Sequence, residues 1–217
     1  MIYMHDQGII HGNLRGVRSN PTVTLPHPSL LNPKSNILID NNGHACLADF
    51  GLLRILSDEP TITSLAGGDT TAQWMSPELL YPNKFGLTDG RPTKESDCYA
   101  LGMTIYEVLS GQTPFFQHSL PNVVWKILDG QRPGRPEGVQ GEWFTDDIWS
   151  LLDFCWKPQP GDRINSKTIL LGLEGEPWSS TPLSNVHGDI ETDAGYQSDG
   201  ASIDSRYFFS MLPQALL

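Results

Sequence analysis

The strongest hydrophobic pattern lies at residues 96–110, where apolar side chains fall nearly all round a helical projection. Ser96 offers an N-terminal cap for this helix, and Gly111 offers a stop. A helix that is apolar all round is normally buried. We therefore expect a buried central helix. Its apolar residues are Tyr99, Leu101, Met103, Ile105, Tyr106, Val108 and Leu109.

Three more helices are expected after the central one. Residues 120–129 form an apolar-periodic run that ends at Gly130. Thr145 can cap a helix that continues through Cys155 and Trp156, and residues 165–173 form a short last helix. The second half of the domain is therefore predicted to be mainly helical.

The chain before residue 52 has a different pattern, with short extended pieces separated by turns. Residues 37–40 and 44–47 are strand-like, and they flank Asn41, Asn42 and Gly43. Because Gly43 can take the positive φ of a tight turn, this pattern predicts a β-hairpin.

The composition suits one globular domain with an appendage. Of 217 residues, 38% are hydrophobic and 18% are charged, and the formal net charge is −11. Residues 174–217 contain seven acidic residues but only one basic residue, Arg206. We expect a folded domain over residues 1–173. An acidic, disordered tail is expected over residues 174–217, ending in the apolar stretch 207–217.

Charge and cysteine content narrow the partners and the location. The negative charge argues against nonspecific binding to nucleic acid or to anionic membranes. No apolar run approaches the roughly 18 residues of a membrane span. Cys46, Cys98 and Cys155 are odd in number and far apart, so we interpret them as buried, reduced thiols. The sequence thus indicates a cytoplasmic protein.

Five short motifs occur in order along the chain: His11-Gly12-Asn13-Leu14, Asn36-Ile37-Leu38-Ile39-Asp40, Asp49-Phe50-Gly51, Ser76-Pro77-Glu78 and Ser96-Asp97. Together they resemble the catalytic loop, metal loop, activation segment and central helix in the large lobe of a eukaryotic protein kinase. Trp74-Met75, Gly130-Gln131-Arg132-Pro133 and Cys155-Trp156 resemble the tyrosine-kinase-like group of Ser/Thr kinases.

The resemblance covers roughly residues 1–173 and implies an α+β, mainly α fold. This fold is a helical bundle with short β-hairpins around the catalytic and metal loops. Because only ten residues precede His11, we expect the small lobe to be absent, together with its glycine-rich loop and its strand lysine.

The resemblance also implies a site for ATP and Mg²⁺. Asp49 corresponds to the residue that holds magnesium at the phosphates, and Asn36 corresponds to the second metal ligand. Both supply oxygen, the ligand atom that a hard cation takes. Taken alone, each residue is more typical of a turn. Without a small lobe, we expect nucleotide binding to be weak.

The catalytic loop departs from the family at two positions. Asn13 stands where the family has the Asp that accepts the proton of the substrate hydroxyl. An amide cannot take up this proton, and loss of a general base costs about 10²- to 10⁴-fold in rate. Gly12 replaces an Arg that pairs with a phosphorylated activation loop. Arg15 stands where the family often has a Lys that touches phosphate, and it keeps the charge with a different geometry.

Residues that support the family's fold are present. Glu78 and Arg163 resemble a buried ion pair, and Asp97 resembles the carboxylate that holds the backbone amides of the catalytic loop. Asp97 is equally suited to complement the dipole at a helix N-terminus. Further structural positions of the same motifs are His11, Phe50 and Gly51.

Residues 17–34 interrupt the catalytic loop with four prolines and no acidic residue. Removing them joins Gly16 to Ser35 and restores His-Gly-Asn-Leu-Arg-Gly-Ser-Asn. The segment is either translated intron sequence, since a Val codon begins GT and a Lys codon can end AG, or a proline-rich surface loop. Such a loop would displace Asn36 unless it bulges outward.

Three functional interpretations follow. The chain is a protein Ser/Thr kinase of impaired or absent activity, a pseudokinase module that binds a protein through the surface around residues 120–138, or a remnant without selected activity. The expected partner is a protein substrate or a protein ligand. Magnesium-dependent nucleotide binding separates the first two interpretations, and failure to fold indicates the third.

Overall fold

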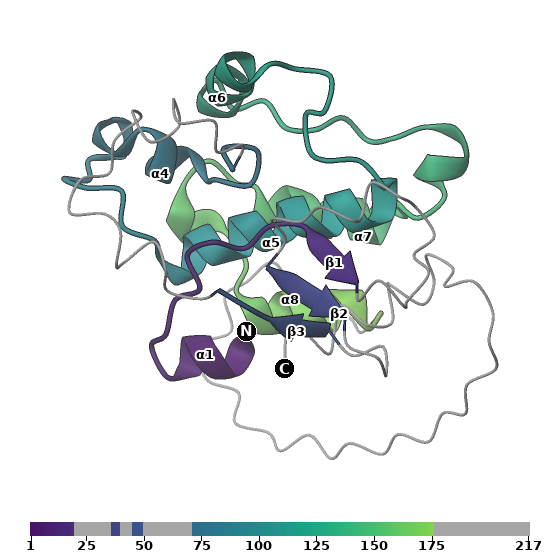
Figure 1. Cartoon of the computed structure of the whole chain (residues 1–217), viewed down its shortest axis with the longest axis horizontal. Coiled ribbons are helices and arrows are strands. Elements are labelled where there is room, and N and C mark those ends of the chain that lie inside the picture. Colours follow the sequence, from purple (N-terminus) through teal and green to yellow (C-terminus); the bar gives the residue numbers. More distant parts are fainter. Residues whose placement is uncertain (20–35, 40–44, 50–70, 176–217) are drawn as a thin grey trace.

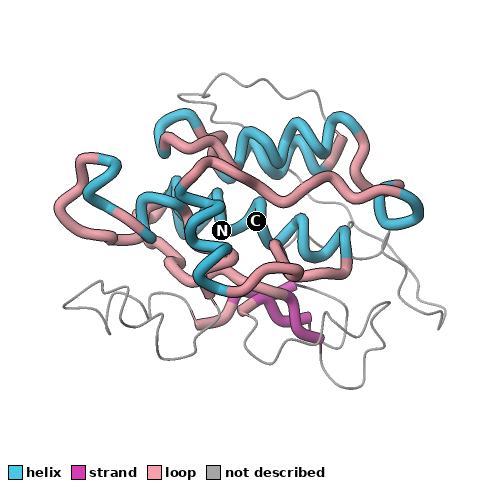
Figure 2. The backbone as a smooth tube through the Cα atoms, turned by 90° about the horizontal axis from the view of Figure 1, so that it is seen from above, coloured by secondary structure: helices cyan, strands magenta, loops and turns pink. Residues whose placement is uncertain are grey.

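The computed structural model describes residues 1–19, 36–39, 45–49 and 71–175 (Figure 1). Helices dominate these residues, and the strands lie together at one edge (Figure 2). The α-helices and strands in chain order are α1 (Ile2–Asp6), β1 (Val17–Ser19), β2 (Ile37–Ile39), β3 (Ala45–Leu47), α4 (Pro77–Leu80), α5 (Lys94–Ser110), α6 (Leu120–Leu128), α7 (Asp146–Cys155) and α8 (Ser166–Leu173). Short 3-10 turns are η2 (Pro82–Phe85), η3 (Gly138–Gly141) and η4 (Pro160–Asp162).

Helix α5 is the central element, and every residue from 96 to 110 is buried. This confirms the predicted buried helix. Gly111 ends it in a left-handed conformation, as expected. The predicted cap was wrong, because Thr93 is the N-cap and Ser96 lies one turn later. The two form a capping box, in which Ser96 N donates to Thr93 Oγ1 (3.2 Å) and Thr93 N donates to Ser96 Oγ (2.8 Å).

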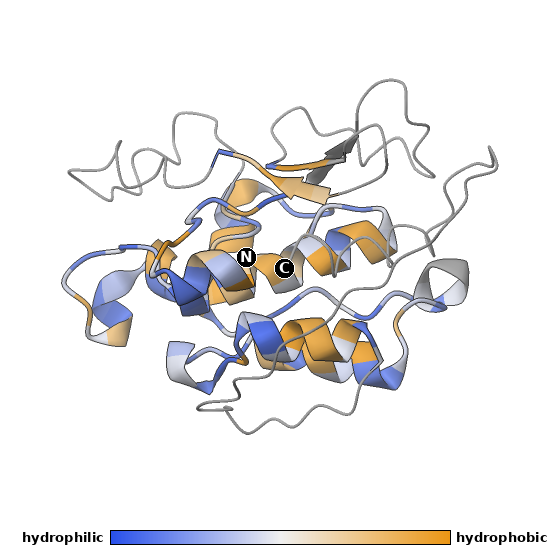
Figure 3. Ribbon diagram, turned by 90° about the horizontal axis from the view of Figure 1, so that it is seen from below, coloured by the Kyte–Doolittle hydropathy of each residue, from blue (hydrophilic) through white to orange (hydrophobic). Residues whose placement is uncertain are grey.

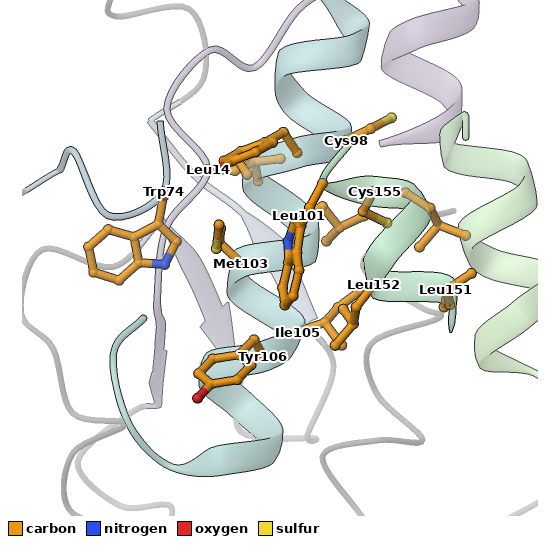
Figure 4. Close-up of a cluster of buried hydrophobic side chains, with 14 of the residues drawn as sticks. Leu14, Trp74, Cys98, Leu101, Met103, Ile105, Tyr106, Leu151, Leu152 and Cys155 are labelled. Carbon is orange, nitrogen blue, oxygen red and sulfur yellow. The ribbon is translucent and has the colours of Figure 1, made fainter. Parts of the chain in front are cut away.

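Helices α5 and α7 pack closely because α5 has a glycine at the contact. A Cβ atom on Gly102 would lie 2.6 Å from Trp156 Nε1 and 2.7 Å from Cys155 Cβ, so no larger residue fits without movement. Figure 4 shows α7 contributing Leu151 and Leu152 on one side of α5, while Trp74 lies on the other. The core is therefore built around α5 on both sides.

The other predicted helices are confirmed with small shifts at their ends. Thr145 caps α7 by accepting from Ile148 N (3.3 Å), and Asn165 caps α8 by accepting from Thr168 N (2.9 Å). Hydrophobic stretches lie on these helices in the interior, with polar residues on many of the connections (Figure 3). Apart from Glu174 and Gly175, the predicted tail lies outside the described residues.

The strands form one three-stranded sheet in the order β1-β2-β3. β2 and β3 pair antiparallel, with Ile37 opposite Leu47, which agrees with the predicted hairpin. The turn between them lies outside the described residues. β1 was not expected. It pairs parallel to β2, with Val17 opposite Ile37, so the first residues of the segment 17–34 belong to the sheet.

Burial of the cysteines was predicted correctly at two of three positions. Cys98 and Cys155 are buried free thiols, whereas Cys46 is an exposed one on β3, because its side chain alternates to the outer face of this strand. Among the described helices, none has the length and apolar character to cross a membrane.

A buried ion pair ties α4 to the chain that follows α7. Arg163 donates to Glu78 through two parallel bonds of 2.7 Å each, and both side chains are almost wholly buried. Arg163 also donates from Nε to the Lys157 carbonyl (2.9 Å) and from Nη1 to the Glu95 carbonyl (3.1 Å). The guanidinium thus joins three segments at one point.

Replacing Glu78 with Gln should lower the free energy of unfolding by about 3–5 kcal/mol, because it leaves a buried guanidinium without its counter-charge. Urea denaturation measures this change. Asp153→Asn is the matched control, since Asp153 pairs with Lys157 at 2.6 Å on the surface and should cost under about 1 kcal/mol. Equal losses in the two variants would contradict a structural role for the buried pair.

Candidate functional site

The loop around residue 12 is fastened to the start of α5 by one carboxylate. Asp97 is 1% exposed and accepts hydrogen bonds from the backbone N–H groups of His11 and Gly12, each at 2.8 Å. These are charge-assisted bonds in a buried setting, where they are stronger than on the surface. The position of the loop is therefore set by its backbone rather than by its side chains.

A buried histidine extends this network to α1 and α8. His5 Nε2 lies 3.0 Å from Asp97 Oδ2, and His5 Nδ1 lies 3.3 Å from Ser166 Oγ. A tautomer that donates to Asp97 and accepts from Ser166 satisfies both contacts. Sequence reasoning missed His5 and Ser166, because neither belongs to a recognisable motif and they are far apart in the chain.

Asn36 lies beside the same loop although residues 17–34 separate it from Asn13 in sequence. Its Nδ2 donates to the Asn13 carbonyl (2.6 Å), and its backbone N–H donates to the Arg15 carbonyl (3.0 Å). Its own carbonyl accepts from Ala48 N (2.8 Å). Asn36 therefore joins the catalytic-loop motif to the segment that carries Asp49.

The side chain of His11 makes a contact within its own loop. It is fully buried, and its Nδ1 accepts from Asn13 N (3.3 Å). Burial lowers the pKa of His11, while the charges of Asp97 and Asp49 and the backbone of Ala48 oppose this shift. A lowered pKa favours the uncharged imidazole at this buried position.

Asp49 is exposed at the end of the described hairpin, with a φ of 56°. This left-handed conformation is uncommon for a residue other than glycine and often marks functional positions. Phe50 and Gly51 lie outside the described residues. No group of three or more His, Cys, Asp or Glu residues that could hold a metal occurs in the described part of the chain.

The backbone explains why residue 12 is a glycine. Gly12 has a φ of 75°, and a Cβ atom there would lie 3.1 Å from Pro92 Cγ. An Arg at this position would therefore need both a strained backbone and movement of Pro92.

A second buried acid on α5 was missed by sequence reasoning. Glu107 is 1% exposed, and its Oε2 accepts from Trp74 Nε1 at 3.0 Å. The sequence did contain one sign of this contact, because Glu107 is an acid within a helix that is apolar nearly all round. A buried acid requires a hydrogen-bond partner. Trp74 belongs to the turn that directly precedes Ser76-Pro77-Glu78.

Comparisons with known proteins agree on one family. The family model for protein tyrosine and serine/threonine kinases matches residues 32–173. The serine/threonine-protein kinase mos of Patiria pectinifera is 29% identical over 178 residues, which are 79% of this chain and 42% of that protein. Tyrosine-protein kinase Abl of Drosophila melanogaster is 33% identical over 140 residues, 64% of this chain and 8% of Abl.

A probable serine/threonine-protein kinase of Dictyostelium discoideum is 29% identical over 149 residues, 68% of this chain and 15% of that protein. The chain thus spans less than half the length of each of these relatives.

Asp97→Asn should lower the free energy of unfolding by about 2–3 kcal/mol. The amide carries no charge, and its NH₂ group would face one of the two backbone N–H groups that donate hydrogen bonds to Asp97. Thermal or urea unfolding reports the loss. Asp89→Asn is the control: Asp89 pairs at 3.0 Å with a largely exposed Arg91, so its loss should be under about 1 kcal/mol. If Asp97→Asn is as mild as the control, the loop is held by other contacts.

Proposed function

The chain belongs to the protein tyrosine and serine/threonine kinase family, and from this premise we propose that its site binds Mg²⁺ with ATP and transfers phosphate to protein Ser or Thr at a strongly reduced rate. The observation that carries the proposal is the contact between Asn36 and the Asn13 carbonyl at 2.6 Å. It brings a metal-ligand position of the family beside the position of the catalytic base.

The donor set fits magnesium. Mg²⁺ is usually bound through one or two protein oxygens, with phosphate and water completing its shell. Asn36 uses its amide nitrogen for Asn13 and so has its oxygen as the metal-binding atom, and Asp49 supplies an exposed carboxylate. When bound, the ion would neutralise the phosphate charge that develops during transfer.

Asn13 sets the limit on the reaction. It can orient a hydroxyl by a hydrogen bond, but it cannot hold the proton that the hydroxyl releases. Arg15, next along the loop after Leu14, provides the positive charge for a phosphate. Orientation and charge compensation are therefore kept while the proton acceptor is lost, so a rate lower by about 10²- to 10⁴-fold is expected.

The substrate class follows from the relatives that are named as serine/threonine kinases. A second candidate function is a pseudokinase module that binds a protein through the surface around residues 120–138. Trp125 on α6 supports it, because this large apolar side chain is 73% exposed. Loss of catalysis with an intact fold favours this second function.

Metal and nucleotide binding can be tested on the full chain with Mn²⁺ as a paramagnetic probe in place of Mg²⁺. With ATP present, Mn²⁺ should broaden the NMR signals of Asn36, Ala48 and their neighbours. Asp49→Asn should abolish this broadening, since it removes the only charged ligand of the pair, whereas Asp89→Asn should leave it unchanged. A folded chain that shows no ATP-dependent broadening would rule out the nucleotide site and leave the interaction module.

Asn13→Asp should raise phosphate transfer from labelled ATP to a mixture of Ser and Thr peptides by about 10²- to 10⁴-fold, because it restores a proton acceptor. Asn13→Ala is the matched control and should give no gain. Equal rates for the two variants would show that a missing base is not what limits this site.

A further inference from the structure

Two pairs of side chains connect α1 to the first turn of α8, and the pairs are neighbours in sequence on both helices. His5 Nδ1 lies 3.3 Å from Ser166 Oγ, and these residues are 5% and 4% exposed. Asp6 pairs with Lys167 at 3.3 Å, but both of these side chains are 53% exposed. The two helices therefore share one contact in the interior and one at the surface.

The buried pair continues to the loop that carries Asn13. On the other edge of its imidazole, His5 Nε2 lies 3.0 Å from Asp97 Oδ2. The same Oδ2 accepts from His11 N (2.8 Å), and Oδ1 accepts from Gly12 N (2.8 Å). A path of buried hydrogen bonds thus runs from α8 through α1 and α5 to the backbone of the loop.

The hydrogens along this path follow from the donors and acceptors that it contains. The hydroxyl of Ser166 has one hydrogen, and within the described part of the chain its partner is His5 Nδ1. If Nδ1 carried a hydrogen, the hydroxyl would accept it and would leave its own hydrogen buried without an acceptor. Donation from Ser166 requires an unprotonated Nδ1, so the imidazole carries its hydrogen on Nε2. That hydrogen is directed at Asp97, where an unprotonated nitrogen would face a carboxylate oxygen.

We propose that Ser166 is a positioning residue for the loop that carries Asn13. Its hydroxyl donates to His5 Nδ1 and holds the imidazole in the tautomer and orientation that give Asp97 a third N–H donor. Because the path is buried, water does not replace a missing donor, and the carboxylate is held in the orientation that binds both loop amides. The start of α8 thereby takes part in placing the loop, although the two segments are distant in sequence.

The placement of the loop is a property of the chain without nucleotide. Its consequence for phosphate transfer rests on the proposed function, whereas the hydrogen bonds themselves do not. The test therefore uses the full chain without ATP. A chain that shows the expected hydrogen bonds and no phosphate transfer would contradict the proposed function and would leave the role of Ser166 intact.

The first measurement is the tautomer of His5 in the unchanged, ¹⁵N-labelled chain at neutral pH. Two-bond NMR correlations between the ring protons and ring nitrogens should show Nε2 protonated and Nδ1 unprotonated. In Ser166→Ala the Nδ1 signal should shift, because this nitrogen loses its donor. A protonated Nδ1 in the unchanged chain would overturn the proposal, since Ser166 could then only accept.

The second measurement is hydrogen exchange of the His11 and Gly12 amides. In Ser166→Ala both should exchange about 5- to 10-fold faster relative to amides in the middle of α5, which report the overall stability of the fold. This factor corresponds to the loss of roughly one hydrogen bond. Ser166→Thr keeps a hydroxyl and should restore both the Nδ1 signal and the slower exchange.

Lys167→Gln is the matched control, because it removes the exposed ion pair between the same two helices. It should leave the ring signals of His5 and the exchange of the loop amides unchanged. Equal effects of Ser166→Ala and Lys167→Gln on the loop amides, or no effect of Ser166→Ala, would overturn the proposal. If Ser166→Ala does not fold, the tautomer of the unchanged chain and the exchange in Ser166→Thr decide the question.

Discussion

A helix without an exposed face imposes a strict condition on every polar group that it carries. In α5 the residues from 96 to 110 are all buried, yet this stretch includes the acids Asp97 and Glu107. A buried carboxylate without partners costs several kcal/mol, so each acid must draw donors from elsewhere in the chain. Asp97 takes two backbone amides of the catalytic-loop motif, and Glu107 takes the indole of Trp74. The arrangement of the site thus follows from the need of the buried acids on α5 for hydrogen-bond donors.

This condition explains how the loop tolerates the departures at Gly12 and Asn13. Asp97 contacts backbone N–H groups, and Asn36 contacts the Asn13 carbonyl, so neither bond depends on the side chain at position 13. The loop can therefore keep its shape whether this position holds a carboxylate or an amide. At position 12 the backbone conformation itself favours glycine. The bonds that hold the loop use backbone atoms of residues 11–13, and the side chain of Asn13 takes no part in them.

The sequence predicted those features that arise from local pattern. The central helix, its end at Gly111, the cap Thr145 and the hairpin pairing are read from periodicity and capping residues, which act over a few positions. The cap at Thr93 was missed because Thr93 and Ser96 are both good capping residues, and only the backbone decides between them. The contacts of His5 with Ser166 and of Glu107 with Trp74 join distant segments, and no local pattern encodes such a pairing.

Residues on either side of the segment between Asn13 and Asn36 lie close together. Asn36 N donates to the Arg15 carbonyl, so residues on either side of the segment are hydrogen-bonded to each other. Directly beyond this bond, β1 and β2 pair in parallel, so the backbone pairing continues into the sheet. Closure entropy grows only slowly with loop length. Once the two ends of the segment are joined, the additional residues between them therefore add little to the free-energy cost of closure. The contact between Asn36 and Asn13 lies next to the bond between Asn36 and Arg15. It can therefore form in the presence of residues 17–34, so this segment does not separate Asn36 from the loop that carries Asn13.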